Sequence, residues 1–233
     1  MEIKKVIIGK GETPKKSKGI IFSTEMVKAI LEGRKTQTRR VITNLYDRNK
    51  FFKLVDSLNG KKGLYAGFYK DSDVFTYEGT IHTDAVYSKA KYQVGDILWV
   101  RETWCRISDW TEVDPEVGMF DGYIYKADTD NASVFSWRPS IHMPKEAARI
   151  FLKVKDVKVE RLNDITEKDA VKEGFINTFG FIHSPDNVYD PPPTTARCKF
   201  IADFCRIYVK DELDTYNNPW VWIIEFERTE ELK

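Results

Sequence analysis

The chain has 233 residues, of which 42% are hydrophobic and 31% charged, as is typical of a globular protein with its own core. A net charge of +1 excludes a uniformly basic nucleic-acid-binding protein. The charge is uneven, because residues 1–50 hold 13 Lys and Arg against 5 Asp and Glu. This excess permits a positive patch facing an anionic partner, although a solvated basic tail is the simpler interpretation of residues 4–18.

The three cysteines, Cys105, Cys198 and Cys205, show no CxxC spacing, so neither a disulfide framework nor a zinc site is expected. Cys198 and Cys205 lie seven positions apart in a helical pattern and are predicted to be small core residues. No apolar run approaches the roughly 20 residues that span a bilayer, and no signal peptide is recognised. We therefore expect a cytoplasmic protein without membrane contact, and no metal or other cofactor.

The chain is predicted to form one domain over residues 19–233, after an N-terminal extension over residues 1–18. Polar and aromatic stretches suggest insertions into this domain at about 44–92, 107–142 and 176–193. No internal repeat is present.

The domain is predicted to open with a short strand at residues 20–22 and a helix over residues 24–31. Ser23 or Thr24 can cap the first turn of this helix. Gly33 suits the position just after the helix, where a positive φ costs glycine little. The apolar stripe that we expect to be buried contains Met26, Val27, Ile30 and Leu31.

The first insertion is predicted to be rich in β-structure. Asn59-Gly60 is a hairpin signal between strand-like runs at 51–55 and 63–69, with a further run at 74–77. A turn at Gly95-Asp96 then leads into a buried strand at 97–100, which we expect to continue through Trp104.

The second half alternates strands and helices. After a strand at 123–125 and a Pro-bracketed loop at 137–144, alternating apolar residues over 149–162 predict one long strand with a bulge near Asp156. Thr166 should cap a helix that runs to Glu173 and ends at Gly174. The last elements are an amphipathic helix over 196–209 and a strand over 220–226, and the helix's expected apolar side contains Phe200, Ile201, Phe204, Ile207 and Tyr208.

Four cations fall within seven residues at Arg34, Lys35, Arg39 and Arg40. Their mutual repulsion does not favour folding, whereas binding of phosphate or carboxylate uses the bidentate donors of Arg. A simpler role, stabilising the helix C-terminus, explains Arg34 and Lys35 but not the whole run. In an extended chain, Lys35, Gln37 and Arg39 share one side, and Thr36, Thr38 and Arg40 share the other.

Glu173 is unusual because it is predicted in the last turn of its helix, where the macrodipole disfavours a carboxylate. It is therefore a candidate for chemistry, with an exposed pair to Lys172 or Lys168 as the ordinary alternative. Lys35 is a second candidate, since neighbouring cations lower its pKa and a neutral lysine can activate Thr38. The alternatives are a phosphate-contacting lysine and a structural threonine.

Further binding candidates lie in the middle of the chain. If the strand continues through Trp104, then Glu102 and Trp104 share a face. There Trp104 can stack on a base and Glu102 can accept a hydrogen bond from its amino group. Equally, Arg101 and Glu102 can form structural ion pairs while Trp104 belongs to the core. His142 lies in the rigid loop at 137–144 and is favoured as a surface or hydrogen-bonded histidine.

Several motifs occur in an order that resembles a known family, the ASCH domain of the PUA-like superfamily. They are G-R-K-T-x-T-R at 33–39, V-G-D-x-L-x-V at 94–100, T-E-x-x-A-x-x-E-G at 166–174 and I-E-F at 224–226. The chain is especially similar to a longer group of this family from bacterial and phage genomes. That similarity rests on F-S-T-E-M-V at 22–27, R-E-T-W at 101–104, W-x-P-S-I-H-M-P at 137–144 and N-P-W-V-W-x-I-E-F at 218–226.

The resemblance implies an α+β fold, a PUA-like partly open β-barrel with flanking helices and, here, β-rich insertions. Many family members are presumed to bind RNA, and a small bacterial type is a metal-independent amidohydrolase that deacylates N4-acetylcytidine. Its catalytic lysine, threonine and glutamate correspond to Lys35, Thr38 and Glu173. By this analogy, Thr38 attacks the amide carbonyl, Lys35 is the base, and Glu173 stabilises or shuttles the proton.

The leading hypothesis is binding of a nucleic acid or nucleoside, RNA or a modified base before DNA, through a basic cleft. The alternative is an amidohydrolase acting on N4-acetylcytidine or a related N-acylated nucleoside. A third hypothesis is a phage or mobile-element protein whose insertions bind a protein partner. The residues expected to contact the ligand are Arg34, Arg39, Arg40, Arg101, Glu102, Trp104 and His142.

Overall fold

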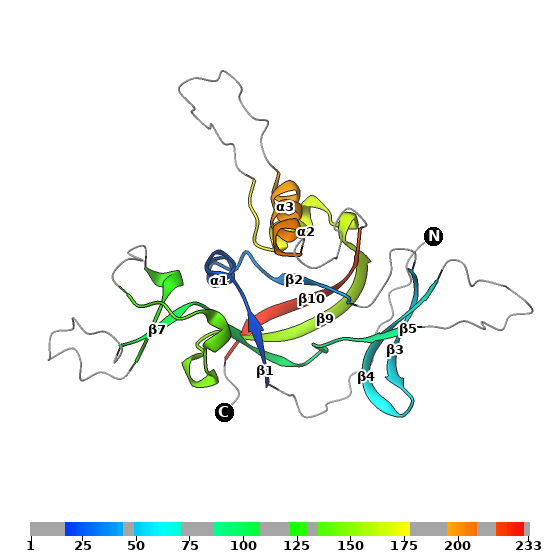
Figure 1. The fold of residues 1–233 in the computed structure, drawn as a ribbon, viewed down its shortest axis with the longest axis horizontal. Helices are drawn as coiled ribbons and strands as arrows, with labels where there is room; N and C mark the ends of the chain where they lie inside the picture. Colours follow the sequence, from blue (N-terminus) through cyan, green and yellow to red (C-terminus); the bar gives the residue numbers. More distant parts are fainter. Residues whose placement is uncertain are drawn as a thin grey trace, which may run out of the picture.

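A computed structural model describes residues 17–43, 49–70, 86–107, 122–129, 135–177, 195–208 and 218–230. Its central element is a five-stranded sheet of order β1-β6-β9-β10-β2, in which β1 is parallel to β6 and the other neighbours are antiparallel (Figure 1). The strands are β1 (Ser17–Ile21), β2 (Gln37–Val41), β6 (Ile97–Arg101), β9 (Phe151–Arg161) and β10 (Trp220–Thr229).

The expected mixture of helices and strands is confirmed, with strands predominating. Within the described ranges the edge strands β1 and β2 are not paired with each other, so the sheet does not close into a barrel. β1 begins at Ser17, inside the segment expected to be an extension, and Lys18 forms an ion pair of 2.5 Å with Asp96. Among the described helices, none is long and apolar enough to cross a membrane.

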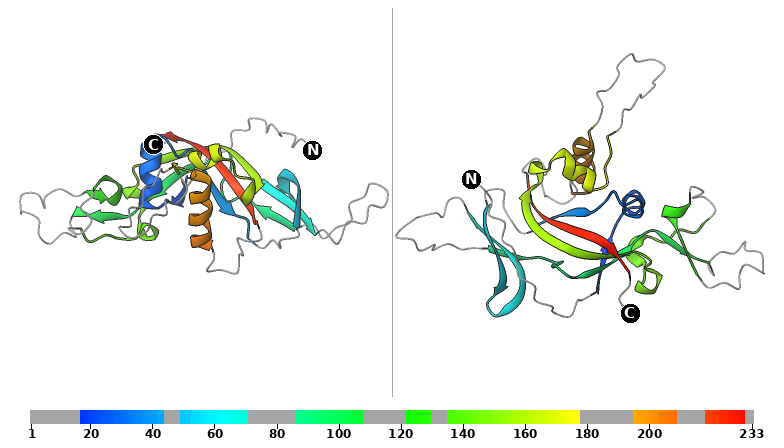
Figure 2. Two further views of the ribbon diagram at one scale, coloured as in Figure 1. Left: turned by 90° about the horizontal axis from the view of Figure 1, so that it is seen from above. Right: turned by 180° about the vertical axis from the view of Figure 1, so that it is seen from behind.

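β9 and β10 are the longest strands of the central sheet and curve together (Figure 2). Their register shifts where Asp156 pairs with Glu225 but Val154 pairs with Phe226, which leaves Lys155 as an extra residue on β9. The Asp156 carboxylate accepts a hydrogen bond from the main-chain N–H of Val157 at 2.9 Å. The bulge predicted near Asp156 is therefore confirmed, and such an insertion bends a strand.

Helix α1 (Thr24–Leu31) follows β1 and agrees with the prediction. The Ser23 hydroxyl caps it by accepting from the main-chain N–H of Met26 at 3.4 Å. Gly33 ends the helical region with φ of +75°. The helix buries Val27 and Ile30 in the larger of the hydrophobic cores. Residues of β1, β6, β9 and β10 also belong to this larger core.

A second sheet contains β3 (Asn49–Leu58), β4 (Lys61–Lys70) and β5 (Val86–Lys89). Asn59 and Gly60 have φ of 48° and 76°, so the predicted hairpin turn is confirmed. Leu64, Ala66 and Phe68 of β4 pack into the larger core beside the central sheet. This part of the insertion is therefore integrated into the fold, while the run expected at 74–77 lies outside the described residues.

The expected continuation of β6 through Trp104 is wrong. β6 ends at Arg101, and Trp104 instead starts β7 (Trp104–Arg106), which pairs with β8 (Tyr123–Tyr125). Two contacts divert the chain: the Glu102 N–H donates to the sulfur of Met143 at 3.2 Å, and Trp104 exchanges main-chain hydrogen bonds with Arg138. The Pro-bracketed loop is irregular as expected. It contains the 3-10 turn η4 (Ser140–His142), and a second 3-10 turn, η5 (Lys145–Ala147), follows it.

Helices α2 (Glu167–Lys172) and α3 (Ala196–Tyr208) lie together near β2 (Figure 1), and they pack on the side of β10 that carries Val221 and Ile223. Both helices were predicted within one residue of these bounds. Their shared core with the sheet contains Leu162, Ile165, Ala170, Ala196, Phe200, Phe204, Val221 and Ile223.

Two predictions about the side chains of α3 are wrong. Cys198 is exposed rather than in the core, and Ile207 is 64% exposed. The face of α3 that packs on α2 and the sheet is set by Phe200 and Phe204. Cys198 is two positions from Phe200, and residues two apart on a helix do not face the same side.

Candidate functional site

Strand β2 presents two chemically different faces. Its pairing with β10 sets Thr38 opposite Ile224 and Arg40 opposite Trp222, on the side of the larger core. Arg39 alternates with them and faces α2. The predicted division between Gln37 and Arg39 on one side and Thr38 and Arg40 on the other is therefore confirmed.

The face toward α2 holds a buried ion pair between Lys35 and Glu173. The Lys35 ammonium donates to Glu173 Oε2 at 3.1 Å, to the Glu173 main-chain oxygen at 2.7 Å and to the Gln37 main-chain oxygen at 2.9 Å. Lys35 is 4% exposed and Glu173 is 2% exposed. Three acceptors thus satisfy the three N–H donors of the ammonium.

Arg39 extends this pair into a cluster of five charges. Its Nη1 donates to Glu173 Oε1 at 3.0 Å, and its Nη2 lies 3.3 Å from Glu160 Oε2 and 4.0 Å from Asp169. Glu173 therefore gives one carboxylate oxygen to Lys35 and the other to Arg39. Within the part of the chain that the structure describes, the buried Nε of Arg39 has no hydrogen-bond partner.

Burial and charge act in opposite directions on this cluster. Burial lowers the pKa of Lys35, the carboxylate of Glu173 raises it, and Arg40 and Arg39 lower it further, with a net decrease. Burial raises the pKa of Glu160 against the opposing charge of Arg39. The cluster therefore contains a lysine that loses its proton more readily than one in water.

The residues before β2 also cap the C-terminus of α2. Arg34 Nη1 donates to the Gly174 main-chain oxygen at 2.6 Å, and the Thr36 N–H donates to the Lys172 main-chain oxygen at 2.8 Å. With the bond from Lys35 to the Glu173 oxygen, three successive carbonyls at this helix end are satisfied. Stabilisation of a helix C-terminus by Arg34 and Lys35 was the simpler role considered for them, and the helix they cap is α2.

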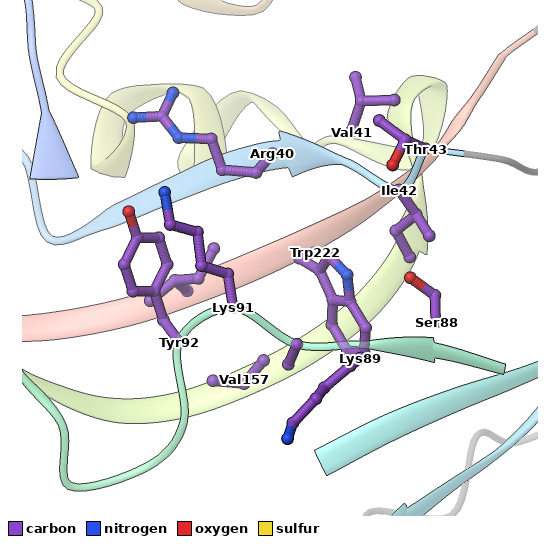
Figure 3. Close-up of a pocket in the computed structure, with 12 residues that line it drawn as sticks. Arg40, Val41, Ile42, Thr43, Ser88, Lys89, Lys91, Tyr92, Val157 and Trp222 are labelled. Carbon is purple, nitrogen blue, oxygen red and sulfur yellow. The ribbon is translucent and has the colours of Figure 1, made fainter. Parts of the chain in front are cut away.

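The other face of β2 borders an open pocket of about 230 Å³ (Figure 3). Arg40, Lys91 and Tyr92 lie at one end, and the hydroxyls of Thr43 and Ser88 lie toward the other. The twelve lining residues include no Asp or Glu, and they are Arg40, Val41, Ile42, Thr43, Ser88, Lys89, Ala90, Lys91, Tyr92, Val157, Trp222 and Ile224.

The cationic end of the pocket is held by contacts to β1. Arg40 Nη2 donates to the Ile21 main-chain oxygen at 3.0 Å, and its guanidinium lies 5.6 Å from the centroid of the Phe22 ring. The Tyr92 hydroxyl donates to the Gly19 main-chain oxygen at 3.1 Å, and the Lys91 ammonium lies 5.3 Å from the Tyr92 ring centroid. The Lys91 side chain points toward Arg40.

The three expected catalytic residues are only partly brought together. Lys35 and Glu173 are in contact, whereas Thr38 is buried on the side of β2 that carries Arg40. Among the hydrogen bonds of the described residues, none joins the Thr38 hydroxyl to Lys35 or Glu173. Thr38 is paired with Ile224, which lines the pocket, whereas Lys35 lies two residues before β2, with its ammonium 5.3 Å from the Phe22 ring centroid.

The remaining expected ligand contacts lie in other surroundings. Glu102 is 1% exposed and accepts from Arg149 at 2.9 and 3.0 Å, so its partner is Arg149 rather than Arg101. Trp104 belongs to a small core with Met143 and Ala147. For Glu102 and Trp104 the geometry agrees with the structural alternative, in which Glu102 forms an ion pair and Trp104 belongs to a core.

Arg101 contacts the segment that carries His142. Arg101 donates to the Ile141 main-chain oxygen and lies over the Trp99 ring, at 5.4 Å from its centroid. His142 is exposed on η4. Neither residue lines the pocket beside Arg40.

Sequence reasoning did not identify Lys91, Tyr92 or Trp222 as site residues. Trp222 is visible only as one of the apolar residues of a strand, and its position opposite Arg40 depends on the strand order. Lys91 and Tyr92 come from the end of the first insertion, and no local pattern indicates that this segment returns to β2.

Known protein families, curated proteins and solved structures give no match to this chain.

Proposed function

We propose that the protein binds a nucleic acid or nucleoside through the pocket beside Arg40. RNA or a modified base is the preferred ligand in this proposal. The observation that carries this proposal is the joint presence of Arg40, Lys91 and the Trp222 ring in one open pocket without a carboxylate. Nucleic acids carry phosphates that attract such cations and bases that stack on aromatic rings.

The charge distribution supports the pocket rather than the buried cluster as the binding surface. In the cluster, Lys35 and Arg39 are paired with Glu173, Glu160 and Asp169, which leaves no net positive charge to offer a ligand. Arg40 is the cation of the Arg34–Arg40 segment that lines the pocket. The cluster fixes β2 against α2, and β2 in turn positions Arg40.

The order of motifs supports the same class of function. We propose that the chain is an ASCH-domain protein with a PUA-like arrangement, in which the unpaired edges of the sheet correspond to a partly open barrel. The described part of the first insertion supplies the wall of the pocket through Ser88, Lys89, Lys91 and Tyr92. This role favours ligand binding over the hypothesis that the insertions serve only to bind a protein partner.

The binding proposal is tested with labelled single-stranded RNA and DNA at low ionic strength. We expect binding that weakens as salt increases, and Arg40→Ala should lower the slope of log K against log salt by about 0.7, the value for one phosphate contact on a single strand. Arg206→Ala is the matched control, because Arg206 is exposed on α3 and pairs with Asp203. Absence of binding at low salt, or equal slopes for Arg40→Ala and the wild type, would overturn the proposal.

A second candidate is hydrolysis of N4-acetylcytidine or a related N-acylated nucleoside. It is favoured by the contact between Lys35 and Glu173 and by the lowered pKa of Lys35. In this scheme the neutral Lys35 amine takes the hydroxyl proton as Thr38 attacks the amide carbonyl, and Glu173 stabilises or shuttles that proton. The amide C–N bond then breaks, cytidine leaves with the proton returned to its amine, and water hydrolyses the acyl-threonine ester. The step requires the Thr38 hydroxyl to come within hydrogen-bonding reach of the Lys35 nitrogen in its neutral form.

The hydrolysis proposal is tested by incubating the purified protein with N4-acetylcytidine and measuring cytidine formation. Lys35→Met and Thr38→Ala should both abolish turnover, whereas Thr38→Ser should retain part of it because serine keeps the hydroxyl. Turnover that is absent in the wild type, or unchanged in Lys35→Met and Thr38→Ala, would rule this candidate out.

A further inference from the structure

We infer that the pocket takes one nucleotide unit in a fixed orientation, with a phosphate at Arg40 and Lys91 and the base against the apolar wall that contains Trp222. This inference rests on the proposed binding function and adds the ligand's size, its phosphate and its direction. The two ends of the pocket differ chemically, because cations lie at one end and the hydroxyls of Ser88 and Thr43 at the other (Figure 3).

The phosphate end is preorganised. One N–H of the Arg40 guanidinium is fixed on the Ile21 oxygen at 3.0 Å, and the Phe22 ring supports the group at 5.6 Å. A guanidinium has five N–H donors, so an anchored one still presents a pair to a phosphate. The exposed Lys91 ammonium points to the same end, and a second cation there strengthens the attraction.

The middle of the pocket suits a flat aromatic group. Trp222 is 6% exposed and packs in the larger core, so a small part of its ring, with Val157 and Ile224, forms the apolar wall of the pocket. Contact with an aromatic side chain accepts any base, because every base has a π-face. The hydroxyls of Ser88 and Thr43 can each donate and accept, so they match the polar edge of any base. The site should therefore be tolerant of base identity.

The volume of the pocket limits what can enter. About 230 Å³ is below the range of roughly 300–1,000 Å³ typical of sites for drug-sized ligands, so the pocket leaves no room for more than one nucleotide unit. A base within a duplex is stacked and paired, so it cannot reach Trp222 without leaving the helix. We therefore expect single strands and free nucleotides to bind and duplexes to bind weakly.

The chain offers an exposed lysine outside the pocket as a control for Lys91. The Lys91 side chain lines the pocket and points toward Arg40. Lys155 lies at the bulge of β9, does not line the pocket, and pairs with Glu227 at 3.0 Å. Lys91→Ala should weaken phosphate binding, and Lys155→Ala should not.

The experiment compares cytidine with cytidine 5′-monophosphate by calorimetry on the full chain, and a single strand with its duplex. We expect the monophosphate to bind at least tenfold more tightly than the nucleoside, and the single strand at least tenfold more tightly than the duplex. Arg40→Ala and Lys91→Ala should reduce the preference for the monophosphate, and Lys155→Ala should keep it. Arg40→Lys preserves the charge and tests the bidentate contact if Arg40→Ala does not fold.

The outcomes separate this inference from the binding function itself. If single strands bind but the monophosphate and the nucleoside bind equally, or the duplex binds as well as the strand, the orientation is wrong and the binding function stands. Equal losses in Lys155→Ala and Lys91→Ala also overturn the orientation. If nucleoside, nucleotide and single strands all fail to bind, both the inference and the binding function are wrong.

Discussion

Lys35 and Glu173, 138 positions apart, are joined by two hydrogen bonds from one ammonium, at 3.1 Å to the carboxylate and at 2.7 Å to the main-chain oxygen. The first bond balances a buried charge, and the second caps a helix. Arg39 takes the other carboxylate oxygen at 3.0 Å. Glu173 is therefore the common partner of two buried cations, and the stability of the β2 region depends on it.

Replacing Glu173 by Gln should lower the free energy of unfolding by about 3–5 kcal/mol, because Lys35 and Arg39 then lack their shared counter-charge. Urea denaturation at pH 7 measures the loss. Glu32→Gln is the control, since Glu32 is the partly exposed partner of Arg34 and its loss should cost less than about 1 kcal/mol. Similar losses in the two variants would contradict the role assigned to Glu173.

The stability contributed by Lys35 should increase with pH. Burial lowers the native pKa of Lys35 below its ordinary value of 10.5, so the native protein binds fewer protons there than the unfolded chain. Stability then rises as the pH increases through the native pKa toward 10.5. Denaturation of wild type and Lys35→Met from pH 7 to 10.5 should show the wild type gaining relative to the variant. A constant difference, or a relative loss, would contradict the lowered pKa.

Two glycines with positive φ should respond differently to alanine. At Gly33, φ is +75° and no atom lies within 4 Å of the added Cβ, so the cost is the backbone strain of about 1–2 kcal/mol. At Gly174, φ is +100° and the added Cβ meets the Cβ atoms of Ala29 at 2.9 Å and Lys35 at 3.3 Å. Gly174→Ala should therefore lose more unfolding free energy than Gly33→Ala, and equal losses would show that the packing around Gly174 is loose.

Arg149→Ala should destabilise the fold by about 3 kcal/mol at pH 7, because it leaves the Glu102 carboxylate buried without its partner. Burial already raises the pKa of Glu102, so lowering the pH protonates it and should reduce the deficit. Denaturation at pH 7 and pH 5 measures both effects. Lys155→Ala, which breaks an exposed pair with Glu227, should change stability by less than about 1 kcal/mol at either pH. A deficit that grows toward pH 5 would contradict the assignment.

Features set by neighbouring residues were predictable from the sequence. The Ser23 cap, the Asn59-Gly60 turn, the Thr166 cap and the glycine at 174 depend on contacts within a few positions. The break after Arg101 was not predictable, because it depends on Met143 and Arg138, which lie far along the chain.

The candidate site shows the same division. The cation run at 34–40 is evident in the sequence, and the resemblance to a family suggested Glu173 as its partner. The pocket was missed, since it forms only when the end of the first insertion approaches β2 and β10 brings Trp222 beside Arg40. Local sequence patterns do not predict such contacts between segments that are distant in the chain.

The position of β10 between β9 and β2 also determines when β2 can join the sheet during synthesis. In the central sheet β2 has β10 as its neighbour, so Thr38 must wait for Ile224 before its strand is paired. At ribosomal rates of about 5–20 residues per second, this interval lasts on the order of 10–40 s. Until then, Arg39 and Arg40 lie on a segment whose partner strand, β10, has not been synthesised. Assembly of the pocket is thus a late step in folding, because it depends on strand pairing across most of the chain.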